Sequence, residues 1–437
     1  MDFSQTRELQ KRLELLVPGG GHTYAKGADQ YPERSPGVLS HGRGSHVWDA
    51  DGNEFIEYGM GLRAVALGHA YEPVLEAVRA ALPLGTNFTR PAAIEFECAE
   101  LFTSIVPNSE MVKFTKDGST ATSAALRIAR AATGREVVGI CADHPFFSYD
   151  DWFISTTTSA AGIPPSERAR VRIFHYNDIA SVDRLFDEYG DQLAAVFLEP
   201  VRTEAPVAGF LERLRERCDE SGVVLVLDEM ITGFRYALAG GQSMYGVTPD
   251  LSTWGKALAN GFSVSALCGR RDLMMLGSRE REGDDVFLLS TTHGAEVCSL
   301  AAAIATMNVY QAEPVIEHLY RQGDRLAEGM REAARRHGVE QYVAPVGFGC
   351  NLVFSTNDPD GQPSQAYRTL FLQETIARGV LMPSLVVSYS HSDADVDRTV
   401  EAIDGALGVY AQAIEAGSTD GFLVGPPSRH VFDREFG

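Results

Sequence analysis

The sequence lacks long apolar runs and is poor in basic residues. No stretch of its 437 residues approaches the ~20 apolar residues that a membrane-spanning helix requires. Lysine and arginine number 38 against 59 aspartates and glutamates, a net charge of −21 that repels phosphate backbones and anionic lipid. Nucleic acid and membranes are therefore disfavoured as partners. The N-terminal stretch MDFSQTRELQKRLELL has a charged amphipathic pattern without a signal-peptide core, so we expect a cytoplasmic protein.

Cysteine is scarce and dispersed, and several common motifs are missing. Because no CxxC pair occurs, we expect small buried thiols rather than disulfides or a zinc site. No dinucleotide fingerprint, GxSxG nucleophile elbow or HExxH helix is found, and Gly255-Lys256 lacks the following hydroxyl of a P-loop. The sequence therefore lacks the usual motifs of enzymes that bind nicotinamide cofactors or nucleoside triphosphates, of serine hydrolases and of zinc proteases. We also predict that the protein binds no metal.

What is present indicates two kinds of domain. From about residue 75 to 315, helix-like windows alternate with short apolar runs such as 193–198 and 223–227. Continuous apolar runs between helices are typical of strands buried on both faces, so we predict an α/β domain with a mainly parallel sheet. A long helix over 314–337, short strands and a last helix over 394–416 predict a smaller α+β unit. The predicted boundaries are 1–70 for an N-terminal segment of the small domain, 71–315 for the large domain and 316–437 for the C-terminal small domain.

The segment VVLVLDEMITGFR, residues 223–235, places a carboxylate at the end of a buried strand. Ligands in open α/β sheets bind at the carboxyl ends of the strands, so Asp228 is expected to point into a crevice. The alternative is that Asp228 starts a turn or caps a helix, with Thr232-Gly233 closing it. The segment alone leaves both possibilities open.

Two further segments carry candidate groups. Lys256 lies between a short apolar strand and small residues, where loss of hydration lowers a lysine pKa and suits a Schiff-base amine. The alternative is a surface lysine beside a turn. Upstream, Gly118, Ser119 and Thr120 open a helix-forming run whose free N–H groups and hydroxyls could hold an anion. Here the alternative is ordinary N-capping by Ser119 or Thr120.

The order of these three segments points to one cofactor. Pyridoxal phosphate (PLP) needs an anion site for its phosphate and a carboxylate that keeps its pyridine nitrogen protonated. It also needs a lysine that holds C4′ and later moves the α-proton. Gly-Ser-Thr, aspartate and lysine occur along the sequence in this order. We therefore predict a PLP-dependent enzyme.

Almost the whole chain resembles the class III (fold-type-I) PLP-dependent aminotransferases, and especially the glutamate-1-semialdehyde 2,1-aminomutases. The segments that carry the resemblance include HVWDADGNEFIEYGMGLRAVALGHAY, VKFTKDGSTATSAALRIARAATGR, VVLVLDEMITGFR and GVTPDLSTWGKALANGFSVSALCGRRDLM. The resemblance implies an α/β fold-type-I PLP transferase. Such a protein has a large domain with a mainly parallel sheet and a smaller α+β domain built from both termini.

The resemblance also implies roles for matching residues. Lys256 would be the Schiff-base lysine and general acid/base, and Asp228 would pair with the pyridine nitrogen. The phosphate would be bound by Gly118, Ser119 and Thr120.

Three more positions are assigned through the same resemblance. Phe146 takes the place of the family's aromatic that stacks on the cofactor ring, and Met230 replaces a valine that packs against it. Thr291 matches a threonine that completes the phosphate site of the neighbouring subunit. The resemblance therefore implies a homodimer with shared active sites.

Departures from the aminomutase pattern concern the substrate. Thr23 and Lys26 stand where that branch has a serine and an arginine for the substrate carboxylate, and a lysine is a point charge rather than a bidentate fork. Arg63 stands where a substrate-facing loop is expected, with a solvated surface arginine as the alternative. These differences favour an aminotransferase for another carbonyl compound, polar or sugar-like, in a biosynthetic pathway. An aminomutase-type intramolecular transfer is the alternative, and intact Lys256 and Asp228 argue against a catalytically silent binding protein.

Overall fold

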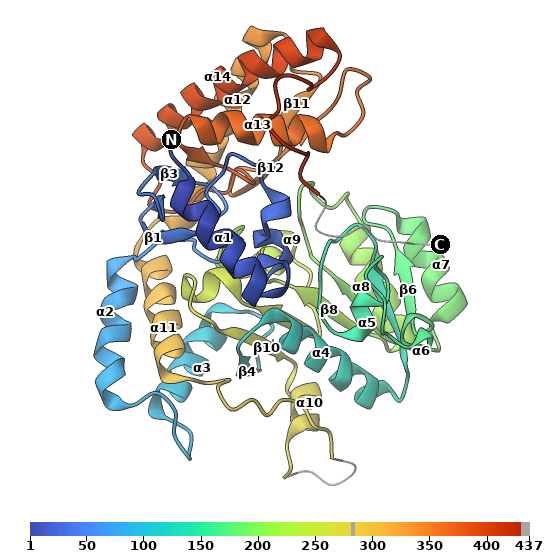
Figure 1. Ribbon diagram of the computed structural model, residues 1–437. Helices are drawn as coiled ribbons and strands as arrows, with labels where there is room; N and C mark the ends of the chain where they lie inside the picture. The colour runs from blue at the N-terminus through green and yellow to red at the C-terminus, as the bar shows by residue number, and fades with distance from the viewer. Residues whose placement is uncertain (281–284, 430–437) are drawn as a thin grey trace. The chain divides into compact units, whose positions relative to one another are not determined.

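The computed structural model describes residues 1–280 and 285–429, which form two compact units. We call Met1–Tyr71 together with Glu317–Arg429 the terminal unit, and Glu72–Ile316 the central unit. Figure 1 shows the elements of both. The domain boundaries proposed from the sequence stay a prediction. Among the described residues, no helix has the length and apolarity needed to cross a membrane.

The central unit contains a seven-stranded sheet in the order β4-β10-β9-β8-β7-β5-β6. Only β10 runs antiparallel to its neighbours, β4 and β9; the other pairs are parallel. The predicted mainly parallel α/β sheet is therefore confirmed. The strands are β4 (Met111–Thr115), β5 (Val137–Cys141), β6 (Val171–Phe174), β7 (Leu193–Leu198), β8 (Val224–Asp228), β9 (Leu251–Trp254) and β10 (Ser265–Gly269).

Strand β8, in the middle of this sheet, is apolar on both faces up to its last residue, Asp228. Val224 and Val226 of β8 belong to one buried cluster, whereas Leu225 and Leu227 belong to a second. Successive side chains of a strand point to opposite faces, so a strand covered on both faces is apolar at successive positions. The helices and 3-10 turns of the unit are α2 (Glu72–Ala81), η4 (Leu82–Leu84), α3 (Ala93–Ile105), α4 (Gly118–Thr133), α5 (Asp151–Ile154), α6 (Pro165–Arg168), α7 (Ile179–Tyr189), α8 (Phe210–Ser221), α9 (Gly240–Tyr245), η5 (Lys256–Ala259), α10 (Arg271–Met274), η6 (Met275–Gly277) and α11 (Val297–Ala312).

The terminal unit joins both ends of the chain in one small sheet, in the order β1-β2-β3-β13. The C-terminal strand β13 pairs in parallel with β3, with Val380 opposite Ile56. A separate antiparallel hairpin is formed by β11 and β12. The elements are α1 (Ser4–Leu16), η1 (Pro18–Gly20), η2 (Tyr24–Lys26), η3 (Ala28–Gln30), β1 (Leu39–Arg43), β2 (His46–Asp49), β3 (Glu54–Glu57), α12 (Val315–His337), β11 (Val343–Phe348), β12 (Asn351–Thr356), α13 (Gln365–Ala377), β13 (Val380–Leu381) and α14 (Asp393–Ala416).

All six cysteines are free and buried, as the sequence predicts. They are Cys98, Cys141, Cys218, Cys268, Cys298 and Cys350.

The core of β8 gives the first prediction. Leu225 is buried, so Leu225→Ala should lower the free energy of unfolding by about 2–5 kcal/mol through lost burial and the remaining cavity. Chemical denaturation followed by far-UV circular dichroism would measure the change. Leu15→Ala, at an exposed position of α1, is the matched control and should change stability little. Equal effects of the two substitutions would contradict the assignment of β8 to the core.

Candidate active site

The candidate residues of the central unit follow strands that end at the same edge of the sheet. Strand β4 runs in the same direction as β8 and β9, because β4 and β9 are both antiparallel to β10. The ends of β4, β5, β8 and β9 therefore carry the segments with Gly118, Phe146, Asp228 and Lys256 to one edge. This is the edge at which open α/β sheets bind ligands.

Asp228 ends β8 as a buried carboxyl group with 3% of its surface exposed. Its Oδ1 accepts hydrogen bonds from the backbone N–H of Met230 (3.0 Å) and the Thr253 hydroxyl (3.1 Å). Burial raises the pKa of Asp228 to about 6, opposed by the charge of Lys256 and by these two hydrogen bonds. Within the described residues Oδ2 has no hydrogen bond, so it can accept one from a ligand.

The adjacent Glu229 has a different task. It is fully buried and accepts hydrogen bonds from the Thr232 hydroxyl and from the N–H groups of Gly241 and Gln242, both at 2.8 Å. Burial raises its pKa to about 7. Glu229, rather than Asp228, therefore fastens the turn at Thr232-Gly233 that the sequence offered as an alternative role for Asp228.

Lys256 begins η5 directly after β9 and has a left-handed backbone with φ of 47°. Its side chain is half-buried, unlike the solvated surface lysine that was the alternative. The preceding Gly255 permits this close turn, because a Cβ there would lie 2.5 Å from Ser265 Oγ and 2.7 Å from Met230 Sδ. The local backbone thus fixes the lysine next to the chain that carries Asp228.

The start of α4 is capped by a residue that the sequence analysis does not name. Asp117 is the N-cap and accepts hydrogen bonds from the Thr120 N–H (2.8 Å) and hydroxyl, so capping by Ser119 or Thr120 is wrong. The N–H groups of Gly118 and Ser119 have no partner within the described part of the chain. They are open to an acceptor such as phosphate. An aspartate just before a helix-forming run is a usual N-cap signal and could have revealed this cap.

Phe146 follows β5 with 41% of its surface exposed, whereas Phe147 is 2% exposed and belongs to the core. Helix α4 anchors this segment through several hydrogen bonds, two of which lie next to Phe146. The Thr122 hydroxyl donates to the Phe147 carbonyl (2.8 Å), and the Tyr149 N–H donates to Ser119 Oγ (3.0 Å). Phe146 is thus held beside the start of α4, and its partly exposed ring packs edge-on against Phe153, with ring centroids 5.6 Å apart.

Met230 lies between the other groups with 6% of its surface exposed. A Cβ built on Gly118 would come within 2.9 Å of its Sδ, and one on Gly255 within 2.7 Å. The side chain therefore contacts both the start of α4 and the turn that carries Lys256. Glycine at both positions makes room for the larger methionine.

The remaining predicted residues lie elsewhere in the described chain. Thr291 is exposed in the loop before α11. Thr23, Lys26 and Arg63 belong to the terminal unit, where Thr23 and Lys26 are exposed and Arg63 is half-buried. Arg63 Nε donates to Asn351 Oδ1 at 2.6 Å, so this arginine is not the fully solvated side chain of the alternative.

Solved structures define the class of enzyme. The PLP form of the FumI protein from a Sphingopyxis species matches with a TM-score of 0.86 at 29% identity, over 95% of this chain and 98% of that chain. An ω-transaminase from Sphaerobacter thermophilus matches with a TM-score of 0.81 at 26% identity, over 93% and 98%. The protein is an α/β fold-type-I PLP enzyme.

Sequence comparisons define the family. The aminotransferase class-III family matches residues 28–407. The glutamate-1-semialdehyde 2,1-aminomutase of Desulfatibacillum aliphaticivorans is 34% identical over 93% of this chain and 99% of its own length. Glutamate-1-semialdehyde 2,1-aminomutase 2 of Brevibacillus brevis is 32% identical over 92% and 98%. The chain belongs to the class III aminotransferases, and its cofactor is PLP.

The residues at the sheet edge fit this cofactor. Two open N–H groups at the start of α4 suit its phosphate, the open Oδ2 of Asp228 suits its ring nitrogen, and exposed Phe146 suits its ring. These matches come from three different elements, so the chemistry of the donor set supports the cofactor independently of the comparisons.

Buried Asp228 predicts a pH-dependent stability. Its pKa is 3.8 when unfolded and about 6 when folded, so its ionised form costs stability above pH 6, and this cost disappears below pH 3.8. Cofactor-free Asp228→Asn should therefore be more stable than the wild type by about 1–3 kcal/mol at pH 8. The difference should shrink toward pH 4. Urea denaturation across this range would measure it, with exposed Asp191→Asn as control. A difference independent of pH would contradict the burial argument.

Proposed function

We propose that this enzyme is an aminotransferase that moves an amino group from an amino donor to a carbonyl acceptor in a biosynthetic pathway. The observation that carries the proposal is the convergence of Asp228, the start of α4 and Lys256 around Met230 at one sheet edge. The chemistry of these groups matches what transamination requires of a protein: a carboxylate, an anion site and a movable proton.

PLP, when bound, supplies a ring that accepts electron density from the bonds at the amino-bearing carbon of the substrate. We assign Lys256 to hold the cofactor at C4′ and to carry the proton to and from that carbon through its Nζ. Asp228 keeps a proton on the ring nitrogen by accepting its hydrogen bond at Oδ2. Burial raises the pKa of Asp228, and the charge of Lys256 lowers it by a smaller amount. The charge of Lys256 thus favours the ionised carboxylate that this role needs.

The surrounding residues position the ring and the phosphate. Gly118 and Ser119 would donate backbone N–H groups to the phosphate, and Phe146 and Met230 would pack on the ring. Thr120 now donates its hydroxyl to Asp117, so it would bind phosphate only by exchanging that partner. We assign Thr23, Lys26 and Arg63 to the substrate, as the sequence indicates.

An aminomutase-type intramolecular transfer is the second candidate. Its support is that the curated relatives at 32–34% identity include several glutamate-1-semialdehyde 2,1-aminomutases. The serine and arginine that would hold that substrate's carboxylate are replaced here by Thr23 and Lys26. This replacement is the reason why we favour transfer between two molecules.

A labelled donor separates the two candidates and tests Lys256. With a ¹⁵N-labelled amino donor, an aminotransferase passes the label to an acceptor and releases a carbonyl product, whereas a mutase needs no net donor.

Lys256→Ala should lower turnover at least ~10³-fold, because both the attachment point and the proton carrier are lost. Borohydride reduction of the wild type, followed by peptide mapping, should find the cofactor on Lys256. Lys113→Ala, at an exposed lysine of β4, is the control. Finding the reduced cofactor on another lysine, or full activity of Lys256→Ala, would refute the assignment of Lys256.

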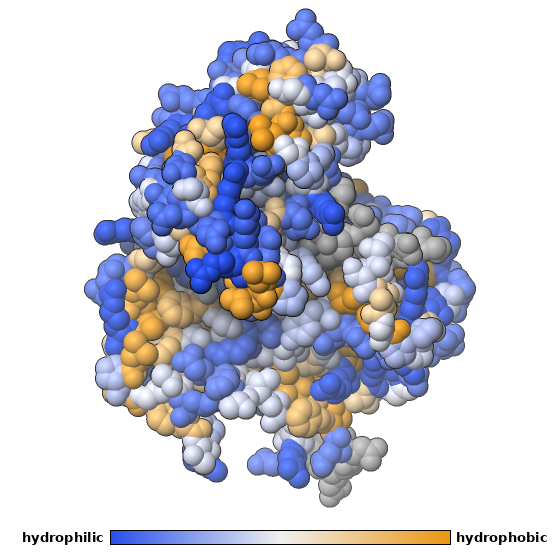
Figure 2. Space-filling view, viewed as in Figure 1, coloured by the Kyte–Doolittle hydropathy of each residue, from blue (hydrophilic) through white to orange (hydrophobic). Residues whose placement is uncertain are grey.

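We further propose a homodimer in which Thr291 completes the phosphate site of a second copy. Thr291 is exposed, and its loop is tied to the segment after η4 by Asn87 Nδ2, which donates to the Thr292 carbonyl at 3.0 Å. This segment exposes Leu84 and Phe88, with Leu82 and Phe96 on either side. Figure 2 shows apolar residues on the surface over α2, which leads into it. Exposed apolar groups lie near a threonine whose hydroxyl has no hydrogen bond among the described residues, and this combination suits a contact between copies.

Mixed dimers test the shared site. Thr291→Ala should weaken PLP binding about tenfold through loss of one charge-assisted hydrogen bond, whereas Thr292→Ala should not. When Thr291→Ala and Lys256→Ala chains are mixed, one site of each hybrid keeps both native residues, and activity should return in part. No recovery in hybrids verified by mass spectrometry would show that Thr291 acts within its own chain.

We also propose a cytoplasmic location. Six free, buried cysteines suit a reducing compartment.

A further inference from the structure

A cavity of about 480 Å³ lies entirely within the terminal unit, between the loop after β3, the hairpin strand β12 and the start of α13. Its volume is in the range of small-molecule sites. Three arginines line it, Arg63, Arg368 and Arg429, and none of the described lining residues is acidic. In a chain with 59 acidic and 38 basic residues, a cavity with only positive charges is unusual.

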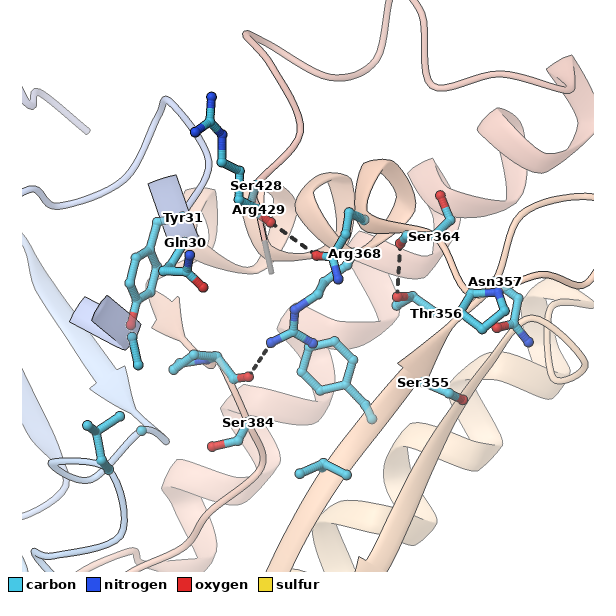
Figure 3. A pocket seen from close by; sticks show the side chains of 18 of the residues that line it. Gln30, Tyr31, Ser355, Thr356, Asn357, Ser364, Arg368, Ser384, Ser428 and Arg429 are labelled. Atoms are coloured by element: carbon cyan, nitrogen blue, oxygen red, sulfur yellow. Dashed lines mark hydrogen bonds between the residues drawn. The ribbon is translucent and has the colours of Figure 1, made fainter. Parts of the chain in front are cut away.

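Arg368 is the arginine whose charged group faces the other lining residues of this cavity. Figure 3 shows its guanidinium among the lining residues, whereas the side chain of Arg429 extends away from it. One Nη of Arg368 donates to the Pro383 carbonyl at 2.6 Å, and the guanidinium lies 4.6 Å from the centre of the Phe354 ring. Within the described residues, its Nε and other Nη have no hydrogen-bond partner, and no carboxylate forms an ion pair with it.

The surroundings of Arg368 do not supply a counter-ion. The guanidinium is half-buried, and burial lowers its pKa, because the charge has lost hydration without gaining an anion. Tyr31 lines the same cavity, and its hydroxyl has no hydrogen bond within the described chain. Glu57, whose charge acts on Tyr31, is already engaged by the Met60 N–H at 2.7 and 2.8 Å and by His69 at 3.1 Å.

The wall next to Tyr31 is a strained turn. Met60, Gly61, Leu62 and Arg63 have φ of 44°, 58°, 59° and 74°, so four successive residues are left-handed. The Arg63 N–H closes this turn on the Gly59 carbonyl at 3.2 Å. A left-handed backbone conformation costs energy for residues other than glycine, and such residues are concentrated at functional sites. Here it brings Leu62 and Arg63 into the lining of the cavity.

We propose that this cavity binds the carboxylate of a small organic anion, with Arg368 as the anchor and Tyr31 as a second donor. A planar guanidinium has two donor edges, each formed by two neighbouring nitrogens, and the bond to Pro383 occupies only one of them. The other edge still matches the two oxygens of a carboxylate. The carboxylate could belong to the amino donor or acceptor, or to a separate ligand. The inference goes beyond the proposed function and does not depend on Lys256.

Calorimetric titration of the PLP-loaded enzyme with glutarate tests the site. Arg368→Gln should weaken glutarate binding at least about tenfold, since a hydrogen-bonded charge is lost, and Tyr31→Phe should weaken it less. Arg429→Gln, whose side chain points away, should bind as the wild type does. Arg368→Lys keeps the positive charge but loses the paired donors of the guanidinium, so its affinity for glutarate should lie between those of the wild type and Arg368→Gln. If Arg368→Gln does not fold, Arg368→Lys and Tyr31→Phe test the proposal in its place.

The same variants identify the source of the carboxylate. If glutarate competes with the amino donor and Arg368→Gln raises the donor KM with unchanged cofactor absorbance, the anion belongs to the substrate. If glutarate binds without competition, a separate ligand occupies the cavity. No glutarate binding, equal affinity in wild type and Arg368→Gln, or binding of inorganic phosphate alone would overturn the proposal. Because calorimetry needs no turnover, these outcomes are distinct from failure of the aminotransferase assignment.

Discussion

The burial of one carboxyl group, Asp228, is the constraint on which the site depends. A carboxylate that has lost its hydration is tolerated only when other groups stabilise its charge. Here the Met230 N–H, the Thr253 hydroxyl and the charge of Lys256 do so, and burial still raises the pKa to about 6. In our proposal the protonated ring nitrogen of the cofactor would supply the remaining stabilisation at Oδ2 of Asp228.

Close packing around Met230 converts three separate chain segments into one site. Gly118 and Gly255 leave space for its sulfur, so the start of α4 and the lysine turn approach the end of β8. The neighbouring Glu229 holds the chain after β8 by accepting hydrogen bonds from Gly241 and Gln242. Asp228 at the strand end thus keeps an open carboxylate oxygen, whereas Glu229, just beyond the strand, fastens the loop.

Sequence patterns identified the parts of the fold that depend on local chemistry. The unbroken apolar run at 223–227 indicated a strand covered on both faces, and β8 is such a strand. The alternative of capping by Ser119 or Thr120 is wrong, because the helix begins at Gly118 and Asp117 is its cap. Aspartate, serine and threonine can all cap a helix, so the sequence alone does not decide between them. Arg368 was missed altogether, since an arginine on a helix without a nearby motif looks like an ordinary surface residue.

The sequence by itself determined the α/β class, the cofactor and the family, because strand periodicity, the order of the anion site, aspartate and lysine, and family resemblance are properties of the linear chain. Tertiary structure alone decided which groups still have open hydrogen-bonding positions. The division of labour between Asp228 and Glu229, the open N–H groups of Gly118 and Ser119, and the unpaired charge of Arg368 all depend on neighbours distant in sequence. Hydrogen bonds and burial depend on how distant segments pack together, and this packing cannot be read from a short stretch of sequence.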